Sequence, residues 1–83
     1  MSWKPGNNLH IVGPDELEID EEGEYYVDGF TIEETYTWTL DGTPITPIRD
    51  GEFVMLEFDD ADDHVLVVSN GKYTGTLNIS VLD

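Results

Sequence analysis

The stretch TYTWTL at residues 35–40 decides the fold class of this 83-residue chain. Its large apolar side chains, Tyr36, Trp38 and Leu40, alternate with threonines, so a β-strand places all three on one face. Threonine and aromatic residues also favour strands over helices. The stretch therefore predicts a half-buried strand, with Trp38 in a hydrophobic core rather than in a ligand groove.

The segment after this strand continues the pattern. Asp41-Gly42 predicts a hairpin turn, and residues 43–48 carry two prolines, which is typical of a sheet edge. Residues 52–58 (EFVMLEF) alternate again, so a strand there turns Val54, Leu56 and Phe58 inward.

The C-terminal third predicts a central strand and its hairpin partner. Residues 64–68 (HVLVV) form a continuous apolar run, which suits a strand inside a sheet. Asn70-Gly71 predicts a two-residue turn. Residues 73–82 then alternate, with Leu77, Ile79 and Val81 inward.

The N-terminal part adds short strands at residues 9–12, 16–19 and 24–27, separated by Gly-Pro and acidic turns. No window shows a helical period of 3.6 residues. About seven short strands in one small chain predict an antiparallel β-sandwich. We expect residues 1–8 to form an extended arm and residues 9–83 to form the domain.

Several stretches resemble the PKD-like branch of the immunoglobulin-like domains. They are IVGPDELEIDEEGEYYVDG (residues 11–29), TYTWTLDG (35–42), FDDADDHVLVVSNG (58–71) and the final TGTLNISVL. The resemblance implies an immunoglobulin-like (PKD-like) antiparallel β-sandwich. Two positions depart from the family pattern: the turn after Trp38 is shorter, and His64 stands where the family usually has a tyrosine.

The charge balance excludes whole classes of partner. Nineteen acidic residues face three basic ones, which gives a formal net charge of −16. Nucleic acid and anionic membrane surfaces both require a basic footprint, so we expect neither nucleic-acid binding nor membrane insertion. The chain has no cysteine, which excludes disulfides and thiolate metal sites.

Acidic clusters raise the question of metal binding. Asp59, Asp60, Asp62 and Asp63 could bind Ca²⁺, which takes several carboxylate oxygens. Their spacing lacks the glycine and the terminal glutamate of an EF-hand loop, so a solvated loop is the alternative. A second cluster at residues 20–24 is read as solvated. No other cofactor is expected, and His10 and His64 are read as structural histidines.

The N-terminal arm carries the one candidate partner contact. Trp3 and Lys4 combine an aromatic side chain with a base, outside the predicted sandwich. Tryptophan often anchors interfaces because it buries a large area. Trp3 and Lys4 therefore form a candidate docking site, and the alternative is a terminus whose tryptophan packs on the domain's own end.

These observations predict a non-catalytic module. No nucleophile motif, phosphate loop or zinc motif is present. The residues near the N-terminus lack the apolar core of a signal peptide, so we expect a small accessory protein that decorates a larger assembly such as a viral capsid or tail. The alternative is a carbohydrate- or protein-binding module of a secreted or surface protein, with Tyr26, Phe30 and Tyr73 as an aromatic platform.

The charge also suits a halophilic source and predicts a stability that depends on salt. Because like charges repel one another less when salt screens them, the urea midpoint is expected to rise between about 0.05 M and 2 M KCl. Urea unfolding followed by tryptophan fluorescence measures it. A flat midpoint would contradict the prediction.

Overall fold

The computed structural model describes residues 9–29, 35–49 and 51–83. Within these ranges the chain forms strands at Ile11–Val12 (β1), Glu16–Glu18 (β2), Gly23–Val27 (β3), Thr37–Leu40 (β4), Thr43–Ile45 (β5), Phe53–Leu56 (β6), Asp63–Ser69 (β7) and Thr74–Leu82 (β8). None of the described segments is a helix long and apolar enough to cross a bilayer.

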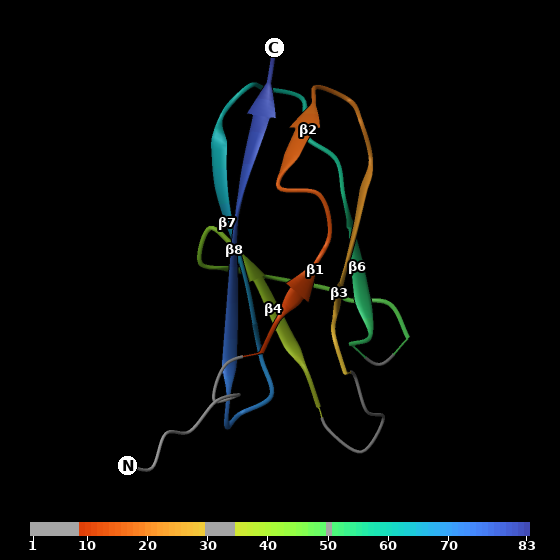
Figure 1. Ribbon diagram of the computed structural model, residues 1–83, viewed down its shortest axis with the longest axis vertical. Coiled ribbons are helices and arrows are strands. Elements are labelled where there is room, and N and C mark those ends of the chain that lie inside the picture. Colours follow the sequence, from red (N-terminus) through yellow and green to blue (C-terminus); the bar gives the residue numbers. More distant parts are fainter. Residues whose placement is uncertain (1–8, 30–34, 50) are drawn as a thin grey trace, which may run out of the picture.

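The strands form two layers (Figure 1). One sheet has three strands in the order β1-β3-β6, and the other has five in the order β2-β8-β7-β4-β5. All pairs are antiparallel except β2 with β8. The prediction of an all-β antiparallel sandwich is therefore confirmed, with the short β2 as a parallel exception.

Alternation places the core between the two sheets, as the sequence predicted. Trp38 and Tyr25 are fully buried, as are Leu66, Val68 and Ile79. The other inward residues of the core are Ile11, Leu17, Val27, Tyr36, Val54 and Leu56. Phe58 and Leu77 pack against this core while remaining partly exposed.

Trp38 does more than fill the core. Its indole Nε1 donates a buried hydrogen bond of 2.8 Å to the carbonyl oxygen of Gly51. Gly51 lies in the connection that carries the chain from β5 in one sheet to β6 in the other. The bond therefore ties a crossing segment to β4, the strand next to the β5 edge of the five-stranded sheet.

Tyr25 holds the connection between β1 and β2, which also passes from one sheet to the other, by a similar hydrogen bond. The chain leaves the three-stranded sheet after β1 and joins the five-stranded sheet at β2, through Gly13-Pro14. The Tyr25 hydroxyl donates a 2.7 Å hydrogen bond to the Pro14 carbonyl. A Cβ on Gly13 would lie 2.3 Å from the Tyr25 ring, so only glycine lets the ring pass this close. Burial, followed by the nearby charges of Asp15 and Glu21, raises the pKa of Tyr25 to about 12.

The hairpin turns agree with the sequence in one case and differ in the other. Asp41 and Gly42 have φ angles of 53° and 85°, as a two-residue type I′ turn requires, and Leu40 pairs with Thr43 around them. Asn70-Gly71 was expected to form a two-residue turn. The connection instead spans residues 70–73, because the Asn70 side chain accepts the amides of Lys72 and Tyr73.

The edge strand was also predicted correctly. β5 pairs only with β4, and Pro44 lies opposite Thr39 at the edge of the five-stranded sheet. β7 lies inside that sheet, between β8 and β4.

Substituting Gly51 and Gly71 by alanine separates backbone strain from steric conflict. Both glycines have positive φ, which costs an alanine roughly 1–2 kcal/mol. A Cβ on Gly51 would also lie 3.0 Å from the Tyr36 Cβ, whereas a Cβ on Gly71 meets nothing within 4 Å. Gly51→Ala is therefore expected to lower the free energy of unfolding clearly more than Gly71→Ala, measured by urea titration. Equal losses would show that the Tyr36 contact is unimportant.

Candidate binding surface

The outer face of the three-stranded sheet carries a row of apolar side chains. Val12 pairs with Tyr26, Tyr26 pairs with Phe53, and Phe53 forms a bridge with Ile48. Residues paired across strands project to the same side of a sheet, so the four side chains form one continuous row. Tyr26 and Ile48 are each 43% exposed. Met55 lies on the same face, opposite Glu24, and is 38% exposed.

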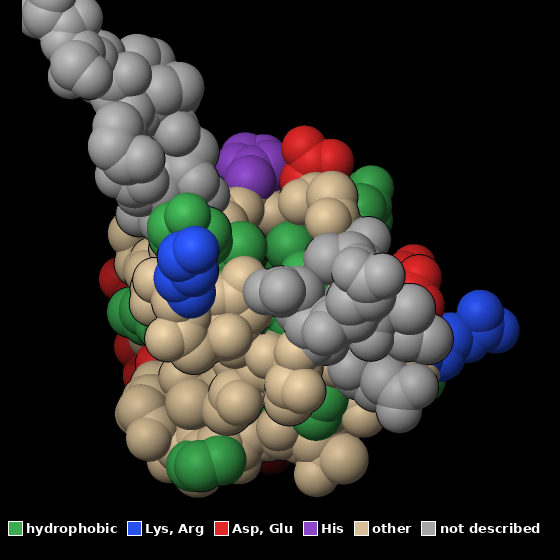
Figure 2. Space-filling model, turned by 90° about the horizontal axis from the view of Figure 1, so that it is seen from below, with side chains coloured by type: hydrophobic (Ala, Val, Ile, Leu, Met, Phe, Trp, Pro, Cys, Tyr) green, Lys and Arg blue, Asp and Glu red, His purple; other side chains and the backbone are tan. Residues whose placement is uncertain are grey.

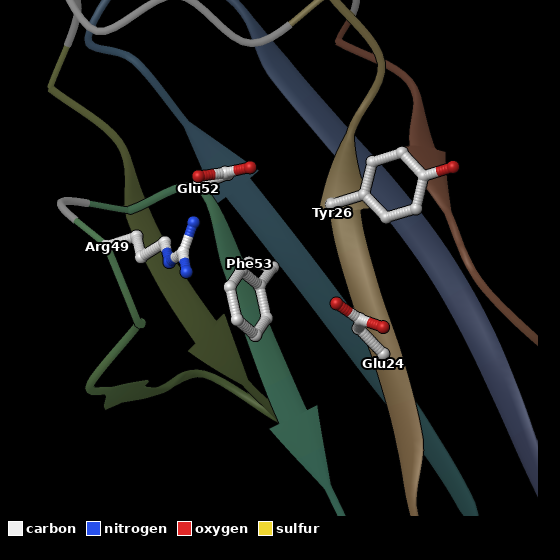
Figure 3. A pocket seen from close by; sticks show the side chains of 5 residues that line it. All are labelled: Glu24, Tyr26, Arg49, Glu52 and Phe53. Atoms are coloured by element: carbon white, nitrogen blue, oxygen red, sulfur yellow. The ribbon is translucent and has the colours of Figure 1, made fainter.

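A hollow of about 410 Å³ lies over this row, lined by Glu24, Tyr26, Arg49, Glu52 and Phe53. Figure 3 shows the Phe53 ring at the centre of the group, with Arg49 and Glu52 toward one side and Glu24 and Tyr26 toward the other. We call these five residues together with Met55 the β3–β6 patch.

The turn before β6 positions the charged members of the patch. Arg49 has a φ of 56°, a left-handed backbone conformation that is uncommon for residues other than glycine, asparagine or aspartate. The Glu52 amide donates to the carbonyls of Ile48 and Arg49, at 3.0 and 3.1 Å. Among the described residues no ion pair joins Arg49 to Glu24 or Glu52. The described charged side chains of the hollow are therefore not paired with one another.

The outer face of the five-stranded sheet has a different chemistry. Its middle rows are Thr37–Ser69–Thr74, Pro44–Thr39–Val67–Thr76 and Val65–Asn78. These rows contain hydroxyl, amide and small apolar groups and no charge. Outward-facing aromatic side chains and an arginine, the residue types enriched at interface centres, occur instead at the outer face of the three-stranded sheet, as Tyr26, Phe53 and Arg49.

The acidic residues gather at one end of the sandwich. Residues 15–22 hold six of the nineteen acids and residues 57–63 hold five. Both segments lie at the upper end in Figure 1, where the Asp20 amide donates to the Phe58 carbonyl at 2.8 Å. Figure 2 shows the opposite end, where the acidic side chains of the described residues that are visible lie around the periphery. The Lys72 amino group lies over the Tyr73 ring, 5.4 Å from its centroid.

The predicted calcium ligands lie at the acidic end. Asp59, Asp60, Asp62 and Asp63 are all exposed, and the Asp62 carboxylate accepts the Asp63 amide at 2.8 Å. In the described part of the chain no three acidic or histidine side chains converge in a way that could hold a metal ion. Calcium binding by these four residues stays a prediction.

His64 has a structural partner, as predicted. Its Nδ1 donates to Asp41 Oδ2 at 2.6 Å, and its ring stacks on Phe58 with centroids 4.2 Å apart. The Val65 amide donates to the other Asp41 oxygen at 2.9 Å. Asp41 thus links the β4–β5 turn to β7. His10 differs from the expectation of a structural role, because its side chain is exposed.

The other residues singled out from the sequence are not brought together. Trp3 and Lys4 lie outside the described residues, as does Phe30. Tyr26 lies on the three-stranded sheet, and Tyr73 lies in the β7–β8 loop of the other sheet. Sequence reasoning missed Phe53, Met55 and Arg49. The alternation of residues 52–58 contains the signal for the first two, because turning Val54 and Leu56 inward turns their neighbours outward.

Comparison with known proteins supports the fold. No protein-family model matches the sequence, and no curated protein matches it at a significant level. The structure resembles the CARDB domain of the PF1109 protein from Pyrococcus furiosus, which was solved in complex with di-metal ions. The TM-score is 0.63 at 16% identity, over 90% of this chain and 86% of that one. The chain therefore has an immunoglobulin-like β-sandwich fold similar to that of a CARDB domain.

The Asp41–His64 contact predicts a pH dependence that a variant can isolate. The His64 hydrogen bond, followed by the Val65 amide, lowers the pKa of Asp41 below its ordinary value. A carboxyl group whose folded pKa lies below its unfolded pKa stabilises the fold above the unfolded value. That contribution is lost as the pH falls through the folded pKa.

Asp41→Asn keeps a residue that tolerates positive φ but removes the titrating group. We expect the unfolding midpoints of the wild type and this variant to differ at neutral pH and to converge in acid. Urea titrations over the acidic range measure both. A constant difference at every pH would contradict the assignment.

Proposed function

We propose that this chain is a non-catalytic interaction module, a small accessory protein that decorates a larger assembly such as a viral capsid or tail. The observation that carries the proposal is the β3–β6 patch. It combines Tyr26, Phe53, Met55 and Arg49, the residue types enriched at the centres of protein interfaces. Exposed tyrosine and methionine gain from burial by a partner and add little to the stability of an isolated domain.

The charge distribution supports the same role. The acidic end would face the solvent and keep assemblies apart through repulsion. Tyr26 and Phe53 pair at one end of the β3–β6 ladder, and the acidic segments adjoin Gly23 and Leu56 at its other end. The sequence motifs in residues 11–29 and 58–71 support a PKD-like domain as the finer classification. Location on a virion or an extracellular surface belongs to the same proposal.

A carbohydrate-binding module is the second candidate, because an exposed aromatic ring beside charged groups can also stack on a sugar. Tyr26 next to Glu24, in a hollow that Arg49 also lines, is the observation that favours it. The flanking charges and the aliphatic Ile48 and Met55 suit a protein surface better than a neutral sugar.

Two matched double variants test the interaction module. Tyr26→Ser with Met55→Ser removes exposed apolar side chains from the patch, and Val65→Ser with Leu82→Ser removes similarly exposed ones from the other sheet. The purified proteins are mixed with capsids or tails isolated from the source and sedimented. Wild type and the second variant should co-sediment, and the patch variant should lose most of its binding.

A wild-type chain that stays free as a monomer at micromolar concentration with every particle preparation would overturn this role. Equal binding by the two double variants would place the contact elsewhere on the chain.

A further inference from the structure

The two sides of the hollow in the β3–β6 patch differ in charge. Figure 3 shows Arg49 on the same side of the Phe53 ring as Glu52, so a cation and an anion share that side. Glu24 lies on the other side, next to Tyr26, and no described residue forms an ion pair with it. The side with Arg49 and Glu52 therefore has no net charge, and the side with Glu24 has a net negative charge beside the Tyr26 and Phe53 rings.

This combination has a defined ligand chemistry. Aromatic faces attract cations, most strongly when the cation is planar and weakly hydrated as in a guanidinium. A neighbouring carboxylate adds a charge-assisted hydrogen bond in the same geometry. Among the described residues that line the hollow, only Arg49 could bind an anionic ligand, within the field of a chain whose net charge is −16.

We infer that the side of the hollow formed by Glu24, Tyr26 and Phe53 receives an arginine or lysine side chain from a basic surface of the partner protein. This inference rests on the proposed function, because it specifies the partner of that same patch. Met55, which pairs with Glu24, borders this side of the hollow and would contact the aliphatic part of such a side chain. The acidic chain attracts a basic surface at long range, and Glu24 fixes where its side chain docks.

A capped peptide with a single arginine, Gly-Gly-Arg-Gly-Gly, probes the site directly. Titrated into ¹⁵N-labelled protein, it should shift the amide signals of residues 24–26 and 52–55. The same peptide with glutamine in place of arginine should not. Because a partly exposed ion pair contributes little, Glu24→Gln is expected to weaken binding about two- to five-fold.

Glu16→Gln is the matched control. Glu16 is also an exposed strand glutamate, but it lies on β2 in the other sheet, and its substitution removes the same charge. It should leave peptide binding unchanged. The spectrum of each variant also reports whether the protein is folded.

Two outcomes overturn the inference in different ways. Shifts centred on residues 15–22 and 57–63, or equal weakening by both variants, would show non-specific attraction to the acidic end and leave the co-sedimentation test of the patch standing. A neutral oligosaccharide that shifts residues 24–26 and 52–55 when the arginine peptide does not would overturn the protein-docking function together with this inference.

Discussion

Two hydrogen bonds from buried aromatic side chains hold the sheets of this domain in register. Trp38 donates to the Gly51 carbonyl and Tyr25 donates to the Pro14 carbonyl, and each acceptor lies where the chain crosses between sheets. A crossing segment leaves the ladder, so its backbone groups need partners elsewhere. The two rings provide these partners and also fill the core, which a purely apolar side chain cannot do. The order of strands in both sheets depends on these points being fixed.

The sequence predicted which side chains of each strand face the core, because this depends only on the alternation of apolar and polar residues. Residues 35–40, 52–58 and 73–82 each gave the correct inward face, since a period of two fixes the side once the strand is assumed. The partners of Trp38 and Tyr25 could not be predicted, because they depend on which loop passes over which ring. The length of the 70–73 connection depends on the Asn70 side chain accepting two amides, and a dipeptide signal does not contain that information. The patch combines outward alternation in β3 and β6 with a pairing register that only the folded chain defines.

The fold brings acidic residues that are far apart in the sequence to one end of the molecule, so its charge is unevenly distributed. The acidic residues at 15–22 and 57–63 are distant in sequence, yet the bond from the Asp20 amide to the Phe58 carbonyl brings them to one end. Concentrating like charges raises local repulsion, which the short connections between strands resist. A domain polarised in this way would approach a basic surface in a preferred orientation, so its field would contribute to the geometry of the docking that we propose.

The same alternation explains why the core and the patch can vary independently. Val54 and Leu56 project from β6 into the core, while Phe53 and Met55 project outward from the same strand. A substitution at an outward position changes neither core volume nor the ladder, so its effect on folding is small compared with that of an inward one. Exposed apolar side chains on such a strand also favour aggregation, and their exposed positions are not explained by the packing of the core. The partner that we propose for Tyr26 and Met55 would supply the explanation that folding alone does not.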